Sequence, residues 1–215
     1  METLSSIIQQ GEHQQLDFKF QISDSKKIAR TLCAFANTDG GRLLIGVKDN
    51  GKVAGVNPEE ELHMIEAAAE MYCSPKLNFT KRVWKEDMKL VLEIQVEQAE
   101  QLPVMARDEE NRWRAYVRRK DHTLLANKIL LQIWKFNQLE NIQPAKMGNE
   151  ETQLLKLIAN EGEVTLSKIY RLSKLPKGKI DRLIALFVYW ELLDMNMNEL
   201  GTSYQISDSE STENA

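Results

Sequence analysis

The amino-acid sequence predicts an α+β protein: a mixed sheet with helices, followed by a smaller and mainly helical domain. Residues 16 to about 139 alternate short apolar strands with amphipathic helices. Residues 150–206 show three helical patterns and then two short strands. The composition, with 42% hydrophobic and 28% charged residues, is typical of a globular protein, and 215 residues are enough for two small domains.

The first predicted domain covers residues 1–140. Alternating or continuous short apolar runs predict strands at 16–20, 43–47, 77–84, 90–96 and 114–119. Helices are predicted at 26–37 behind Ser25, at 59–72 behind Pro58, and from about 123 to 139. We expect Ile129 and Ile133 of the last helix to join the core of this domain.

The second predicted domain covers residues 150–206, after a linker at 141–149 that contains Pro144 and Gly148. Helices are expected at 150–160, at 165–172 with Thr165 as a cap, and from 177 onward. A polar turn between 192–195 and 202–206 predicts a hairpin. Three helices followed by a hairpin is the order of a winged helix-turn-helix. Residues 207–215 are expected to form a disordered acidic tail.

Basic residues gather in one segment of an otherwise acidic chain. The formal net charge is −4, but residues 168–182 hold six basic residues against Asp181 alone, a local charge of +5. Salt confines an electrostatic field to about 8–10 Å, so such a patch can hold phosphates whatever the net charge. A solvated surface is the alternative interpretation. The six are Lys168, Arg171, Lys174, Lys177, Lys179 and Arg182.

Several classes of protein are not supported by the sequence. Cys33 and Cys73 are the two cysteines, too few for a disulfide framework or a zinc site made of cysteines alone. No apolar run approaches the roughly 18–20 residues that span a bilayer, and the first residues lack a basic start and a long apolar stretch. We therefore expect a cytoplasmic protein without a membrane partner.

Three sequence blocks carry a family resemblance. The segments GEHQQLDFK (11–19), AFANTDGGRLLIGVKDNGKVAGV (34–56) and RAYVRRKDHTLLA (114–126) resemble the AlbA-type domain of bacterial regulators and Schlafen proteins. That family was formerly grouped with divergent ATP-binding proteins. The resemblance implies an AlbA-like mixed sheet, binding of DNA, and a family motif made of Asn37, Thr38, Gly40, Gly41 and Gly46.

The motif residues also have a direct physical interpretation. Gly40 and Gly41 permit a positive φ and a close backbone approach where a helix turns back into a strand. Asn37 and Thr38 can satisfy the last carbonyls of that helix, so a structural turn and a ligand contact are both open. The glycines lack the spacing of a phosphate-binding loop, and no G-x-x-x-x-G-K-[ST] segment is present, so we expect no ATP site.

Three acidic residues suggest a nuclease as the alternative function. Glu12, Asp17 and Asp49 match positions at which some Schlafen proteins carry carboxylates that cleave RNA. Such a trio would bind Mg²⁺ or Mn²⁺, with Lys19 assisting the leaving oxygen, and no other cofactor is expected. It converges only if the strands that begin at Leu16 and Leu43 pair antiparallel, because parallel pairing separates the acids. The plain alternative is an Asp17–Lys19 ion pair and a turn capped by Glu12.

The strand at 114–119 offers a second basic surface. Arg114 and Arg118 share one strand face with Tyr116 between them, and Arg119 follows. Such a stripe suits phosphate contact and base stacking, whereas a solvated sheet face is the alternative.

The segment 150–206 resembles winged helix-turn-helix domains of bacterial transcription regulators. In that fold the third helix enters the major groove by its first residues, here Lys177, Gly178, Lys179, Asp181 and Arg182. We therefore expect a DNA-binding transcription regulator that acts on duplex DNA as a homodimer, with RNA as a possible second partner. The alternatives are a metal-dependent endoribonuclease acting on structured RNA and a non-catalytic protein-interaction module.

Overall fold

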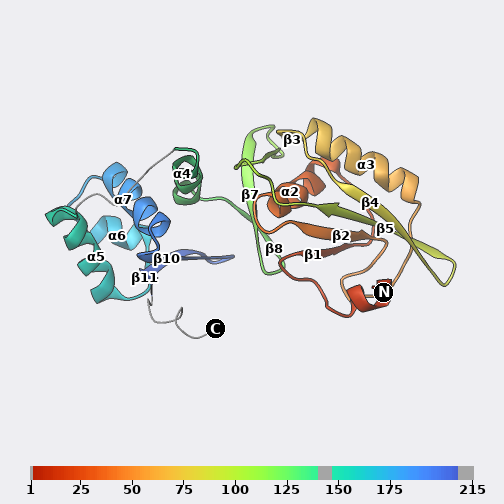
Figure 1. The fold of residues 1–215 in the computed structure, drawn as a ribbon, viewed down its shortest axis with the longest axis horizontal. Helices are drawn as coiled ribbons and strands as arrows, with labels where there is room; N and C mark the ends of the chain where they lie inside the picture. Colours follow the sequence, from red (N-terminus) through yellow and green to blue (C-terminus); the bar gives the residue numbers. More distant parts are fainter. Residues whose placement is uncertain (1, 140–146, 208–215) are drawn as a thin grey trace. The chain divides into compact units, whose positions relative to one another are not determined.

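The computed structural model describes residues 2–139 and 147–207 and divides into two compact units (Figure 1). Unit 1 is Met1–Ala126 and unit 2 is Asn127–Ala215. The α+β class that the sequence predicts is confirmed, because each unit combines helices with a sheet.

The described residues of unit 1, from 2 to 126, form two four-stranded sheets and three helices. Its helices are α1 (Leu4–Ile8), α2 (Ser25–Ala36) and α3 (Pro58–Met71). Its strands are β1 (Leu16–Lys19), β2 (Gly41–Ile45), β3 (Cys73–Ser74), β4 (Thr80–Glu86), β5 (Lys89–Val96), β6 (Met105–Arg107), β7 (Trp113–Arg119) and β8 (His122–Leu125).

The first sheet has the order β1-β2-β5-β4, and the second has the order β3-β6-β7-β8. Strands β1 and β2 are parallel, with Asp17 opposite Leu43, and every other pairing is antiparallel. Helix α2 connects β1 to β2 and packs against β6 and β7 of the second sheet as well as α3. It is therefore the central element of unit 1.

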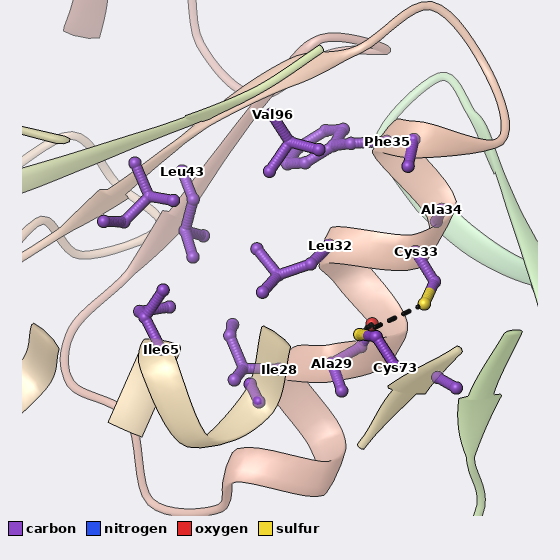
Figure 2. Packing of buried hydrophobic residues seen from close by; sticks show 14 of the residues in the cluster. Ile28, Ala29, Leu32, Cys33, Ala34, Phe35, Leu43, Ile65, Cys73 and Val96 are labelled. Carbon is purple, nitrogen blue, oxygen red and sulfur yellow. Dashed lines mark hydrogen bonds between the residues drawn. The ribbon is translucent and has the colours of Figure 1, made fainter. Parts of the chain in front are cut away.

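The sequence of α2 explains its central place. Eight of its twelve residues are buried, including Leu32 and Phe35, and small residues such as Ala29 and Ala36 let neighbouring elements approach closely. Its side chains point toward Leu43, Ile65 and Val96 in Figure 2, which other elements contribute. The carboxylate of Asp24 accepts from the amide of Lys26 at 2.8 Å, so Asp24 rather than Ser25 caps the helix.

Two glycines let the chain turn from α2 into β2. Gly40 has φ +70°, and a Cβ there would lie 2.8 Å from the carbonyl oxygen of Val96. A Cβ at Gly41 would lie 2.3 Å from Cδ1 of Phe35. Any side chain at these positions would displace the backbone of β5 or the ring of Phe35, so both glycines are required by packing.

Unit 2 contains the three helices and the hairpin that the sequence predicts, together with one more helix and a short strand. Its core gathers Ile158, Ile180 and Phe187 around Tyr204 of the hairpin. The strands form an antiparallel sheet of order β10-β11-β9. The elements are α4 (Lys128–Asn137), α5 (Asn149–Glu161), β9 (Val164–Thr165), α6 (Leu166–Leu172), α7 (Lys177–Tyr189), β10 (Leu193–Asn198) and β11 (Gly201–Ile206).

The structure places the boundary between the units near residue 126, and not at the predicted residue 140. The segment predicted as a helix from 123 begins as strand β8, because residues 122–125 pair with β7, and α4 starts only at Lys128. Helix α4 packs on α7, and Ile129 is fully buried in the core of unit 2. The prediction that Ile129 and Ile133 belong to the first core is therefore wrong.

The predicted linker lies outside the described residues except at 147–149, where α5 begins at Asn149. The predicted tail lies outside them except for Ser207. Within the described ranges, no helix has the length and apolar character needed to cross a membrane.

Candidate nucleic-acid interface

A buried ion pair joins the start of β1 to β7. The guanidinium Nη2 of Arg118 lies 2.7 Å from Oδ1 of Asp17, and the two side chains are 3% and 5% exposed. Arg118 also donates from Nη1 to the Thr123 hydroxyl at 3.2 Å, and its guanidinium carbon lies 5.4 Å from the centre of the Phe35 ring. The Arg118 charge is thus paired within the protein, although its Nε has no hydrogen-bond partner, and its burial keeps it from a ligand at the surface.

Two further charged groups surround Asp17. Nζ of Lys19 lies 2.7 Å from Oδ2 of Asp17, the ion pair that was the plain alternative to a catalytic role. Oε1 of Glu12 accepts from the amide of Phe18 at 2.9 Å. Burial, with the neighbouring Asp17 carboxylate adding to it, raises the pKa of Glu12 above its ordinary value although the Phe18 amide opposes the shift.

Asp49 does not join this group, and the predicted metal site of Glu12, Asp17 and Asp49 is therefore wrong. Strands β1 and β2 pair in parallel, so the end of β2 leads away from Asp17 toward the far end of β1. Asp49 lies four residues beyond β2 in an exposed turn. Across residues 2–139 and 147–207, no three His, Cys, Asp or Glu side chains gather as metal ligands.

The predicted basic stripe on β7 is also corrected by burial. Arg118 and Tyr116 are 2% and 8% exposed, so neither offers a surface for phosphates or bases. Nε of Arg114 lies 3.6 Å from Oδ2 of Asp108, and Nη1 of Arg119 donates to the carbonyl of Arg118 at 3.5 Å. Side chains alternate along a strand, so Tyr116 and Arg118 do share a face of β7. These two residues are buried, and β7 packs against α2.

The polar residues of the family motif link the end of α2 to the backbone of β7 and of Val104. Nδ2 of Asn37 donates to the carbonyls of Val104 at 2.7 Å and Tyr116 at 2.8 Å, and its Oδ1 accepts from the Val104 amide at 2.7 Å. The Thr38 hydroxyl donates to the carbonyl of Ala34 at 2.8 Å and accepts from the Arg118 amide at 2.9 Å. Both side chains are buried, which favours the structural interpretation of this motif over ligand contact.

A polar pocket of about 370 Å³ lies beside the two glycines of the motif. Two of its lining side chains are bound to other groups: Nε2 of Gln15 donates to the backbone carbonyl of Asp39 at 2.7 Å, and Nη1 of Arg42 lies 2.9 Å from Oε1 of Glu2. Gly46, the last motif residue, has φ +103°. A Cβ at this position would lie 3.2 Å from the carbonyl oxygen of Leu90. It too is fixed by close packing.

The basic segment of unit 2 has exposed cations on α6, on α7 and in the turn between them. Arg171, Lys174, Lys177 and Arg182 are all exposed. Two others have acidic partners: Nζ of Lys168 lies 2.6 Å from Oε2 of Glu161, and Lys179 pairs with Glu150. The hydrogen bond from Lys179 to Glu150 raises the pKa of that lysine. We call the four exposed residues the α6–α7 cations.

A polar network fixes α7 against α4 and α6. The hydroxyl of Tyr170 donates to Asp181, and Nζ of Lys128 lies 2.7 Å from Oδ2 of the same carboxylate. Burial and the hydrogen bond to Asp181 raise the pKa of Tyr170. Asp181, the acid of the basic segment, is therefore already paired with Lys128 and Tyr170 inside the unit.

The start of α7 favours an anion further. Pro176 occupies the cap position and gives no side-chain hydrogen bond, and no acidic residue stands in the first turn. The helix dipole and the first amides therefore add positive potential where Lys177 lies. A Cβ at Gly178 would meet no atom within 4 Å, so this turn is open to an approaching surface.

The hairpin of unit 2 has the opposite charge. Residues 191–206 contain Glu191, Asp194 and Glu199 and no lysine or arginine. Leu200 at its tip is 99% exposed. Lys128 has no local signal in the sequence, because its partners Tyr170 and Asp181 lie 42 and 53 positions away.

Comparison with known proteins gives the family of the first unit. Residues 12–127 match the sequence model of the family described as Schlafen, AlbA_2. No curated protein matches the chain. The C-terminal winged helix-turn-helix that the sequence predicts is not supported by these comparisons.

Two solved structures are similar to the chain at low sequence identity. The DIP2311 protein of Corynebacterium diphtheriae is 18% identical with a TM-score of 0.42, over 90% of this chain and 34% of its own. The chain thus spans about a third of that protein. The N-terminal domain of a RecG-related protein of Nitrosomonas europaea, named after an ATP-dependent DNA helicase, is 17% identical with a TM-score of 0.43, over 69% of this chain and 99% of its own.

Proposed function

Because the chain belongs to the Schlafen, AlbA_2 family, we propose that it binds nucleic acid, and that unit 2 makes the contact with duplex DNA. The observation that carries the proposal is the exposure of the four α6–α7 cations, of which Lys177 opens α7. Unit 2 then acts as a winged helix-turn-helix whose third helix, α7, meets the major groove by its first turn.

The strength of the contact follows from the number of exposed cations. A cation that neutralises a phosphate releases condensed counterions, and each contributes about −0.9 to the slope of log K against log salt. Four cations predict a slope of about −3 to −4. Lys168 and Lys179 add less, because each must leave a carboxylate before it meets a phosphate.

The acidic hairpin limits how unit 2 approaches DNA. Its three carboxylates would be repelled by phosphates, so the hairpin stands away from the backbone while α6 and α7 make the contact. We further propose a regulatory role and a homodimer, since two copies of α7 would read a two-fold site. Light scattering with and without duplex DNA measures that stoichiometry.

The test is a titration of fluorescent duplex DNA with the full chain at several salt concentrations. The double variant Lys177→Ala/Arg182→Ala should flatten the slope by roughly two. Its matched control is Lys135→Ala/Lys156→Ala, which removes the same charge from exposed positions of unit 2 on α4 and α5. This control should keep the wild-type slope.

Equal slopes for the wild type and for Lys177→Ala/Arg182→Ala would contradict contact through α7. Binding independent of salt, or absent at low salt, would favour a protein-docking role for unit 2 instead. A preference for structured RNA over duplex DNA would overturn the choice of ligand.

A further inference from the structure

The two cysteines of the chain lie in contact although 40 positions separate them. Cys33 belongs to α2 and Cys73 to β3, and their sulfur atoms are 3.4 Å apart (Figure 2). Both residues are buried, with 0% and 4% exposure, and both are free thiols. Sγ of Cys73 also faces the carbonyl of Ala29 at 3.8 Å.

This contact brings together the only two side chains able to form a disulfide in a chain of 215 residues. An S–S bond is about 2.0 Å long, so the sulfurs need to approach by about 1.4 Å. Cys73 lies on the two-residue strand β3, which pairs with β6 alone, and a short edge strand can make such a shift more easily than α2 can.

We propose that Cys33 and Cys73 form an oxidation site that hydrogen peroxide converts into an intramolecular disulfide. In the first step one thiol attacks a peroxide oxygen, the O–O bond breaks, and a sulfenic acid and one water form. In the second step the other thiol attacks the sulfenic sulfur, the S–S bond forms, and a second water leaves with the remaining thiol proton. Two electrons pass from the sulfurs to the peroxide.

Burial controls how fast the site reacts. It raises the pKa of the Cys33 thiol, with the adjacent Cys73 adding to the effect, so little thiolate exists in the closed structure. Oxidation therefore proceeds through local opening around β3 and is slower than for an exposed thiol. Once formed, the disulfide is shielded from reductants by the same burial.

The bond would fasten α2 to the second sheet of unit 1. It closes a loop of 40 residues that contains β2 and α3, and closing such a loop restricts the unfolded chain. The oxidised protein should therefore unfold at a temperature roughly 5–10 °C higher in unit 1. Neither cysteine belongs to unit 2, so DNA binding by the α6–α7 cations should not change, and the two proposals fail independently.

The experiment treats the full chain with hydrogen peroxide, removes the oxidant, unfolds the protein with N-ethylmaleimide present, and measures its mass. The expected product is 2 Da lighter than the reduced chain and takes no maleimide, whereas the untreated protein takes two. Thermal unfolding of the same samples followed by circular dichroism should show the higher midpoint.

The single variants Cys33→Ala and Cys73→Ala are the matched controls, and each should lose both the mass change and the shift of the midpoint. Exposed methionines such as Met88 can also gain oxygen, so the maleimide uptake of the monomer is decisive. A treated wild-type monomer that still takes two maleimides, or a disulfide-linked dimer in its place, would overturn the proposal. The wild-type mass decides the matter even if a variant fails to fold.

Discussion

Units 1 and 2 both carry basic residues on elements that the sequence marks as candidates, but those of β7 in unit 1 are buried or half-buried, whereas most of those in unit 2 are exposed. In unit 1, Arg118 is closed into an ion pair with Asp17 inside the protein, and Arg114 faces Asp108. In unit 2, Arg171 and Lys174 are exposed at a turn between two helices. A basic side chain can therefore contribute to an interface or to the packing of the interior, depending on its burial and its partners.

The same contrast applies to the family motif. Asn37 and Thr38 belong to the most recognisable block of the sequence, yet every polar atom of theirs that hydrogen bonds here does so with the backbone of unit 1. A block that identifies the family therefore marks a structural requirement. The residues proposed to meet DNA lie outside residues 12–127, which match the family.

The largest effect should come from breaking the buried ion pair. Arg118→Met leaves Asp17 buried with Lys19 as its remaining cation, and losing one partner of such a pair costs about 3 kcal/mol of unfolding free energy. The matched control is Arg114→Met on the same strand, whose side chain is 42% exposed and should cost less than about 1 kcal/mol. Urea unfolding measures the free energy of unfolding of both variants. Equal losses would mean that the difference in burial between the two arginines does not affect stability.

The next effect tests the frame role of the motif. Asn37→Ala removes three hydrogen bonds and leaves the amide of Val104 and two carbonyls without that partner, at a cost of about 2–3 kcal/mol. Asn78→Ala, an exposed asparagine in the same unit, is the control and should change stability by about 0.5 kcal/mol or less. If Asn37→Ala is as stable as the wild type but loses ligand binding, the motif is a contact site.

Most elements could be predicted from the sequence, because their signals are local. Periodicity located α2, α3, β5 and the three helices before the hairpin, and Thr165 caps α6 as expected by accepting from the amide of Lys168. The boundary was missed because the apolar residues of α4 fit either core, and only packing on α7 assigns them.

The candidate site was predicted in part for the same reason. A run of basic residues on consecutive helices is visible along the chain. The burial of Arg118 depends on β1, a hundred residues away, and the separation of Asp49 from Asp17 depends on parallel pairing. Strand direction and long-range ion pairs have no local signature in one sequence.

A smaller effect concerns Glu12 and depends on pH. Its raised pKa means that the folded state favours the protonated form of Glu12. The contribution of this group to the free energy of unfolding is therefore fully present below its unfolded pKa and is lost as pH rises through the folded pKa. Glu12→Gln does not ionise and keeps an oxygen for the Phe18 amide. Its stability relative to the wild type should therefore increase between about pH 4 and about pH 7.

Urea midpoints at several pH values measure this relative stability. The control is Glu97→Gln, an exposed glutamate on the same unit, for which the difference from the wild type should stay nearly flat over the range. A decrease for Glu12→Gln as pH rises would show that the Glu12 carboxylate stabilises the fold in its charged form.

The most direct test of the central contrast is to measure how fast an amine-reactive ester labels each lysine, with and without duplex DNA. Lys174 and Lys177 should be labelled several-fold more slowly when the duplex is bound, because each would face a phosphate. The exposed lysines of unit 1, such as Lys81, Lys85 and Lys120, should react at unchanged rates. Protection of those three lysines, with Lys174 and Lys177 still reactive, would contradict the assignment of the interface to unit 2.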